Sequence, residues 1–172
     1  KVAKTNKPII LSLGLANLQD IEIALKTIKK NGNNKVILLQ CVSSYPARIE
    51  EQNINSLKNI NKKFKTIVGL SDHTKGYIAP LTAVAIGAKA IEKHFNLSNN
   101  KSVDSFFSTS EKEFKNMVTN IRLTESALGN GKIKISTSGM ENYNSRRSIY
   151  VSNNIRIGDK ISSKNIKIVR PN

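Results

Sequence analysis

The sequence is poor in the residues that secreted, membrane-embedded or base-stacking proteins need. It contains a single cysteine, Cys41, so no intrachain disulfide can form, which is typical of a reducing cytoplasm. Tryptophan is absent, and aromatic residues make up only 5% of the chain. No apolar run approaches the roughly 18 residues that a membrane-spanning helix requires. We therefore expect a cytoplasmic protein that does not enter a membrane, with Cys41 buried at a strand end.

Acidic residues are also scarce, with 12 aspartates and glutamates against 28 lysines and arginines, which gives a net charge of +16. Such a balance can indicate a nucleic-acid partner. Here the lysines are scattered singly rather than gathered in one stripe, and few aromatic side chains are present on which bases could stack. We expect no nucleic-acid partner, and the positive charge instead favours the attraction of an anionic small substrate.

Four successive strand–helix units follow one another in the first three quarters of the chain. Short apolar runs predict buried strands over 8–13, 35–41, 66–70 and 88–95. Asn17 with Asp20, and Ser110 with Glu113, are signals for the start of helices. The repetition predicts a parallel α/β fold, and periodicity leaves open whether this is an open doubly wound sheet or half of a (β/α)₈ barrel.

The sequence changes character after residue 129. Residues 130–145 are rich in glycine, serine and asparagine and predict a linker. Residues 146–172 predict short strands with a turn at Gly158 and Asp159, which is too little chain to bury a core of its own. Because the first residues also begin within a pattern, we expect the chain to be a fragment.

Polar side chains gather at the carboxyl ends of the predicted strands, where α/β folds bind ligands. Residues two apart in a strand share a face, so Ser71 and His73 are expected to point the same way, as are Glu92 and His94. The ends of the two earlier strands add Ser12, Ser43 and Tyr45. One edge of the sheet is therefore predicted to collect these side chains.

His73 and His94 are the only histidines and lie about one strand–helix repeat apart, so they are expected on neighbouring strands. Two imidazoles that meet at a strand edge can bind a divalent metal and leave coordination positions open for a substrate. The alternative is a hydrogen-bonded pair without a metal, and the residues alone leave both open. Asp104, in a polar loop, and Arg170 carry no functional signal by themselves.

Three motifs resemble the sialic acid synthase family, which includes N-acetylneuraminate, legionaminate and pseudaminate synthases. KPIILSLGLANLQDIEIAL is similar to the family pattern KPxILSTGMAxxxEIxxA, and LLQCVSSYPA is similar to LLHCTSxYPA. VGLSDHTKGYIAPLTAVAIGAKAIEKHF is similar to GxSDHTxGxxxxxxAVAxGAxxIEKHF. The resemblance covers nearly the whole chain, and SDHT followed by EKHF at this spacing is specific. Departures include Gln40 for the usual His and Ser43 for a frequent Asn.

This resemblance implies a (β/α)₈ barrel followed by a small antifreeze-like (SAF) domain. Residues 1–129 would supply barrel strands five to eight, and residues 146–172 would begin the SAF domain. The family forms dimers in which a SAF arginine reaches the partner's site, and Arg170 is its match. We therefore expect a homodimer with exchanged SAF domains.

The resemblance also implies roles for the edge residues. His73 and His94 would bind Mn²⁺ or Mg²⁺, while Ser12 and Ser71 would contact phosphoenolpyruvate. The catalytic residues would be Glu92 and Asp104, which face the sugar. The same interpretation adds two substrate contacts, Tyr45 and Ser43.

The implied activity joins phosphoenolpyruvate to an acetamido sugar aldehyde and releases phosphate. Ser102 to Ser108 resemble the VDSxFS loop of pseudaminic acid synthases, so the expected sugar is 2,4-diacetamido-2,4,6-trideoxy-L-altrose. The alternatives within the family are N-acetylneuraminate and legionaminate synthases. Two other classes stay open: an aldolase that forms a Schiff base through Lys93, and a non-catalytic binding remnant. Lys93 is expected to point away from Glu92 and His94.

Overall fold

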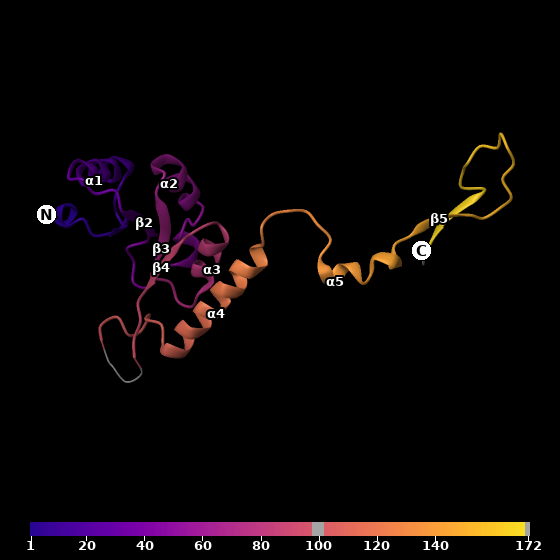
Figure 1. Cartoon of the computed structure of the whole chain (residues 1–172). Helices are drawn as coiled ribbons and strands as arrows, with labels where there is room; N and C mark the ends of the chain where they lie inside the picture. The colour runs from indigo at the N-terminus through magenta and orange to yellow at the C-terminus, as the bar shows by residue number, and fades with distance from the viewer. Residues whose placement is uncertain (98–101, 171–172) are drawn as a thin grey trace. The chain divides into compact units, whose positions relative to one another are not determined.

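The computed structural model describes residues 1–97 and 102–170, and the chain divides into two compact units, Lys1–Gly129 and Asn130–Asn172. Figure 1 follows the chain from indigo at the N-terminus to yellow at the C-terminus. Within the two described ranges, no helix combines the length and the apolar character needed to cross a bilayer. All the predicted site residues except Arg170 lie in the first unit.

The first unit is built on a four-stranded parallel sheet whose strands follow the order of the sequence. The strands are β1 (Ile9–Ser12), β2 (Val36–Cys41), β3 (Ile67–Asp72) and β4 (Ala90–Lys93). The predicted parallel sheet is confirmed, and its order without a reversal is that of one half of a (β/α)₈ barrel. β4 is shorter than the predicted range 88–95, because the chain leaves the sheet after Lys93 and Phe95 forms an isolated bridge with Thr109.

A helix follows each strand, as the repeat predicts. The helices are α1 (Leu18–Lys30), α2 (Ser56–Phe64), α3 (Ile78–Ala85) and α4 (Glu111–Leu128), with 3₁₀ turns η1 (Val2–Thr5) and η2 (Ile49–Glu51). Both predicted capping pairs form. Asn17 caps α1 with Asp20, and Ser110 caps α4 with Glu113, each pair exchanging side-chain and backbone hydrogen bonds.

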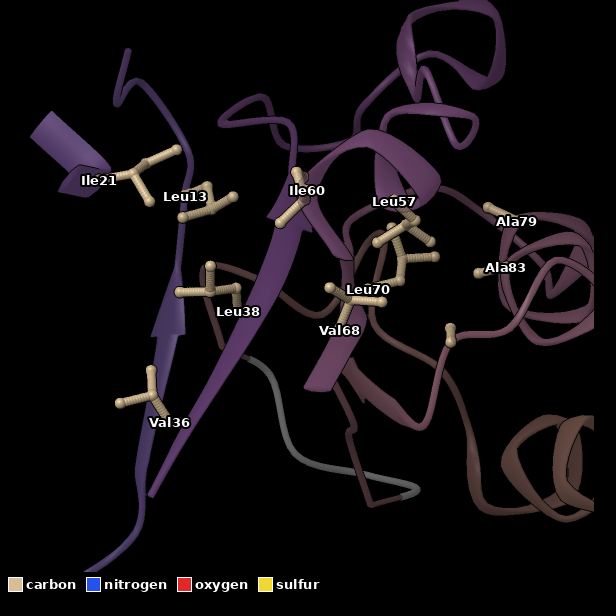
Figure 2. Close-up of a cluster of buried hydrophobic side chains, with 11 residues drawn as sticks. Leu13, Ile21, Val36, Leu38, Leu57, Ile60, Val68, Leu70, Ala79 and Ala83 are labelled. Carbon is tan, nitrogen blue, oxygen red and sulfur yellow. The ribbon is translucent and has the colours of Figure 1, made fainter. Parts of the chain in front are cut away.

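Alternate residues of the sheet pack against the helices and form the core. Leu38 of β2 and Leu70 of β3 are fully buried, and Leu38 is aligned with Val68 on the neighbouring strand. Figure 2 shows the core cluster, whose labelled members are Leu13, Ile21, Val36, Leu38, Leu57, Ile60, Val68, Leu70, Ala79 and Ala83. Because side chains alternate along a strand, Ser71 and Glu92 project to the opposite face.

That opposite face contains a close approach at Gly69. Gly69 is aligned with Leu39 of β2 and Ala90 of β4. A Cβ atom at Gly69 would collide with the carbonyl oxygen of Ala90 and would lie 2.7 Å from Cδ2 of Leu39. Glycine therefore permits the packing directly beneath Ser71, the next residue on the same face.

The second unit contains an antiparallel pair of short strands, β5 (Ser148–Val151) and β6 (Ile166–Val169). The segment predicted as a linker, 130–145, contains the one-turn helix α5 (Thr137–Met140) and the 3₁₀ turn η3 (Tyr143–Ser145). Ser136 accounts for α5, because its hydroxyl accepts a hydrogen bond from the N–H of Gly139. Residues 171 and 172 of the predicted SAF segment lie outside the described residues, and the SAF identity stays a prediction.

Candidate functional site

The carboxyl ends of β2, β3 and β4 place Cys41, Ser71 and Glu92 in one aligned row. The hydroxyl of Ser71 donates a hydrogen bond to Oε1 of Glu92 over 2.7 Å. Ser71 is buried, whereas Glu92 is exposed. The buried hydroxyl therefore fixes the direction of an accessible carboxylate.

His73 follows β3 and is held by the chain that leaves β2. Its Nδ1 atom lies 2.8 Å from the carbonyl oxygen of Val42. Because a carbonyl oxygen can only accept, we assign the proton to Nδ1. The backbone carbonyl of His73 also accepts a hydrogen bond from the N–H of Ala47, and the sulfur of Cys41 lies 3.9 Å from Nδ1. A neutral His73 therefore keeps the lone pair of Nε2 for a ligand.

His94 lies beside a carboxylate of the loop that follows β4. Its Nδ1 atom lies 3.4 Å from Oδ2 of Asp104. The loop returns to the strand end, because the N–H of Thr109 donates to the carbonyl of His94 over 2.8 Å. Within the loop, the N–H and hydroxyl of Ser108 both donate to the carbonyl of Asp104. Nε2 is again the ring nitrogen left for a ligand.

The two imidazoles meet at this edge, with their ring centroids 5.1 Å apart and their planes at 79°. A shared metal with bonds of roughly 2.1 Å would place two imidazole centroids roughly 4.5–6.5 Å apart. The separation of His73 and His94 falls within this range. Among the described residues, no group of three or more His, Cys, Asp or Glu side chains is arranged to hold a metal. The remaining coordination positions would fall to water or substrate oxygens.

Two aromatic rings enclose the histidine pair. The ring centroid of Tyr45 lies 4.3 Å from that of His73, and the ring centroid of Phe107 lies 4.8 Å from that of His94. Tyr45 is half exposed, whereas Phe107 is buried. Sequence reasoning missed Phe107. Its only signal is the apolar pair Phe106 and Phe107 in a polar loop, which does not tell which ring turns inward.

The other predicted residues come from β1, from the chain after β2 and from the second unit. Ser12 ends β1 and is aligned with Leu39 of β2, which is aligned with Gly69 of β3. Ser12 is therefore two strands away from Ser71 and level with the residue two positions before it. Ser43 is exposed after β2, close to the turn that follows β1, where a Cβ atom at Gly14 would lie 2.8 Å from its hydroxyl. Arg170 is exposed in the second unit.

The comparisons with known proteins agree on one family. Residues 1–133 match the NeuB family. The chain is 42% identical to the pseudaminic acid synthase of Campylobacter jejuni strain 81-176, with 99% of this chain and 50% of that protein aligned. It is also 42% identical to the N,N'-diacetyllegionaminic acid synthase of Campylobacter jejuni strain NCTC 11168, covering 99% of this chain and 52% of that protein.

A solved structure gives the same result. The crystal structure of N-acetylneuraminic acid synthetase from Leptospira borgpetersenii, in complex with citrate, superposes with a TM-score of 0.73 at 35% identity. The match covers 82% of this chain and 50% of that chain. The chain thus spans about half the length of the curated relatives that it matches.

Proposed function

Since the chain belongs to the NeuB family, we propose that it carries part of the active site of a nonulosonic acid synthase. The reaction would join C3 of phosphoenolpyruvate to the aldehyde carbon of an acetamido sugar, with addition of water at C2 and release of phosphate. The observation that carries this proposal is the meeting of His73 and His94 beside the hydrogen-bonded pair Ser71 and Glu92.

His73 and His94 would hold the divalent metal, Mn²⁺ or Mg²⁺, through Nε2. When bound, such an ion acts as a Lewis acid that polarises a carbonyl oxygen. The protein's own contribution is to hold Nδ1 of His73 against the Val42 carbonyl and to place the Asp104 carboxylate 3.4 Å from Nδ1 of His94, which would leave the lone pair of each Nε2 for the metal.

The polar side chains around the histidines would bind and orient the two substrates. Hydroxyl groups of Ser12, Ser43 and Ser71 are suited to donate hydrogen bonds to carboxylate or phosphate oxygens. Glu92 and Asp104 are accessible carboxylates that would orient sugar hydroxyls and exchange protons with them. The net charge of +16 would attract the anionic phosphoenolpyruvate.

We assign the enzyme to the pseudaminic acid synthase group, with 2,4-diacetamido-2,4,6-trideoxy-L-altrose as the sugar. The support is the resemblance of Ser102 to Ser108 to the VDSxFS loop of pseudaminic acid synthases. This loop carries Asp104 and Phe107, which lie beside His94. The alternative is an N-acetylneuraminate or legionaminate synthase, and the equal identity to two Campylobacter synthases does not separate these groups.

Two features of the proposal extend beyond the first unit. Arg170 would reach the site of a second copy in a homodimer, as the family resemblance implies. A cytoplasmic location stays a prediction based on the single cysteine.

Two other classes of function are less well supported. A Schiff-base aldolase needs a free amine, whereas the ammonium of Lys93 is buried and bonded to Asp72. A non-catalytic binding remnant gives no role to two histidine rings 5.1 Å apart at the edge of the sheet that carries Glu92.

The proposal is tested with the full-length protein, Mn²⁺ and phosphoenolpyruvate. Either the diacetamido sugar or N-acetylmannosamine is added, and product mass and released phosphate are measured. We expect one phosphate for each nonulosonic acid formed, and a higher kcat/KM for the diacetamido sugar. A preference for N-acetylmannosamine would refute the subgroup, and the absence of product with both sugars and with the diacetamido sugar of legionaminate synthases would refute the synthase proposal.

A further inference from the structure

A buried ion pair lies on the face of the sheet opposite the candidate site. Nζ of Lys93 is 2.7 Å from Oδ2 of Asp72, and these two side chains are 2% and 0% exposed. Asp72 and Lys93 are directly aligned on β3 and β4. Asp72 directly precedes His73, and Lys93 directly precedes His94. The ion pair therefore links the carboxyl ends of β3 and β4, immediately before the two histidines.

The same ammonium also holds the chain on the far side of His73. Nζ of Lys93 donates a second hydrogen bond, of 2.7 Å, to the carbonyl of Thr74. The N–H of Thr74 donates to Oδ1 of Asp72 over 2.9 Å. Lys93 therefore binds the residues on both sides of His73, while its own C-terminal neighbour is His94. One side chain connects the backbones of both proposed metal ligands.

Stability alone does not explain this arrangement. Removing two charges from water is costly, and well-packed apolar side chains of similar volume often stabilise a protein as well or better. A buried ion pair instead enforces one geometry, because each hydrogen bond has a preferred length and direction. The core beside it is apolar, with Leu70 two residues before Asp72 on the same face. The pair of Asp72 and Lys93 lies where the distance between β3 and β4 determines whether the two histidine rings come together.

We propose that Asp72 and Lys93 are positioning residues that set the separation of His73 and His94 for metal binding. This inference rests on the metal site of the proposed function. Neither residue would touch the metal or the substrates, because both side chains lie on the helix-facing side of the sheet. Their effect would pass through the backbone at His73, Thr74 and His94.

The test is the affinity of the full-length protein for Mn²⁺, measured by calorimetry and by the electron paramagnetic resonance signal of free Mn²⁺. The double variant Asp72→Asn with Lys93→Met removes both charges and keeps similar side-chain sizes, so no unpaired buried charge remains. We expect a folded protein whose Kd for Mn²⁺ is raised about 10–100-fold, the range found when groups behind metal ligands are changed. At saturating Mn²⁺, kcat should stay close to that of the unmodified protein.

The matched control is another ion pair that joins two elements. Lys63 of α2 and Glu22 of α1 are 2.8 Å apart and about half exposed. The double variant Glu22→Gln with Lys63→Met should bind Mn²⁺ as the unmodified protein does. Equal weakening in both double variants would overturn the proposal, as would unchanged affinity in the folded variant of Asp72 and Lys93.

Should that double variant fail to fold, Asp72→Glu replaces it. This change keeps the charge and lengthens the side chain by one methylene. The carboxylate can then bond to the Lys93 ammonium only if that ammonium shifts. Weaker Mn²⁺ binding supports the proposal, and unchanged affinity overturns it. Failure of the unmodified protein to bind Mn²⁺ would instead contradict the proposed function itself.

Discussion

Ser71 and Glu92 are aligned on neighbouring parallel strands, and the Ser71 hydroxyl donates to the Glu92 carboxylate over 2.7 Å. Because Glu92 is exposed, its carboxylate can be changed without opening the core. Glu92→Gln keeps an oxygen to accept the Ser71 hydrogen bond but removes the charge and the ability to take a proton. We expect kcat to fall by about 100-fold, as is typical for loss of an acid–base group, with thermal stability unchanged.

A surface glutamate gives the matched control for this experiment. Glu125 on α4 is exposed and also accepts a 2.7 Å hydrogen bond, from Arg122. Glu125→Gln should leave kcat unchanged in the same assay of phosphate release. Full activity of Glu92→Gln would remove Glu92 from the proposed catalytic residues.

Phe107 is the buried wall of the histidine pair, 4% exposed and packed against His94 and Tyr45. Phe107→Ala should lower the free energy of unfolding by about 3 kcal/mol, since truncating a buried phenylalanine leaves a cavity. Phe106 is 61% exposed, so Phe106→Ala should change the free energy of unfolding by about 0.5 kcal/mol or less. Urea denaturation measures both values. Equal effects of the two substitutions would show that Phe107 is not the inward-facing ring.

Glu113 makes the stability of α4 depend on pH. Hydrogen bonds from the backbone and side chain of Ser110 lower the pKa of Glu113 from its ordinary value of 4.5. A carboxyl group whose pKa is depressed on folding stabilises the protein above the unfolded pKa, and this contribution is lost as the pH falls through the folded pKa. Glu113→Gln should therefore destabilise the protein by about 0.5 kcal/mol at pH 7, a typical value for an acid at a helix N-terminus.

The pH series provides the check on this assignment. The difference in free energy of unfolding between the unmodified protein and Glu113→Gln should shrink steadily below pH 4.5. An undiminished difference well below that pH would mean that the charge of Glu113 is not its cause.

The strands, helices and caps of the first unit could be predicted because they depend on local patterns. Apolar runs, together with capping signals such as Asn17 and Ser110, are sufficient to predict the four strand–helix repeats. The end of β4 could not be predicted, because Phe95 leaves the sheet to pair with Thr109, which lies beyond a loop. Local propensity at Phe95 carries no information about that partner.

The histidine pair could be predicted for a similar reason, since strand alternation places Ser71 with His73 and Glu92 with His94. Its supporting contacts could not. The expectation that Lys93 points away from Glu92 followed from the same alternation, but its burial against Asp72 and Thr74 depends on the helices that cover the sheet. Likewise, only the path of the loop decides that Asp104 meets Nδ1 of His94.

In the proposed site, His73 and His94 bind one metal ion through their imidazole nitrogens. Electron spin-echo spectroscopy of Mn²⁺ bound to the full-length protein detects directly coordinated nitrogen. We expect modulation from two imidazole nitrogens in the unmodified protein and from one in either His73→Ala or His94→Ala. Bound Mn²⁺ without nitrogen modulation, or a spectrum that neither substitution changes, would contradict it.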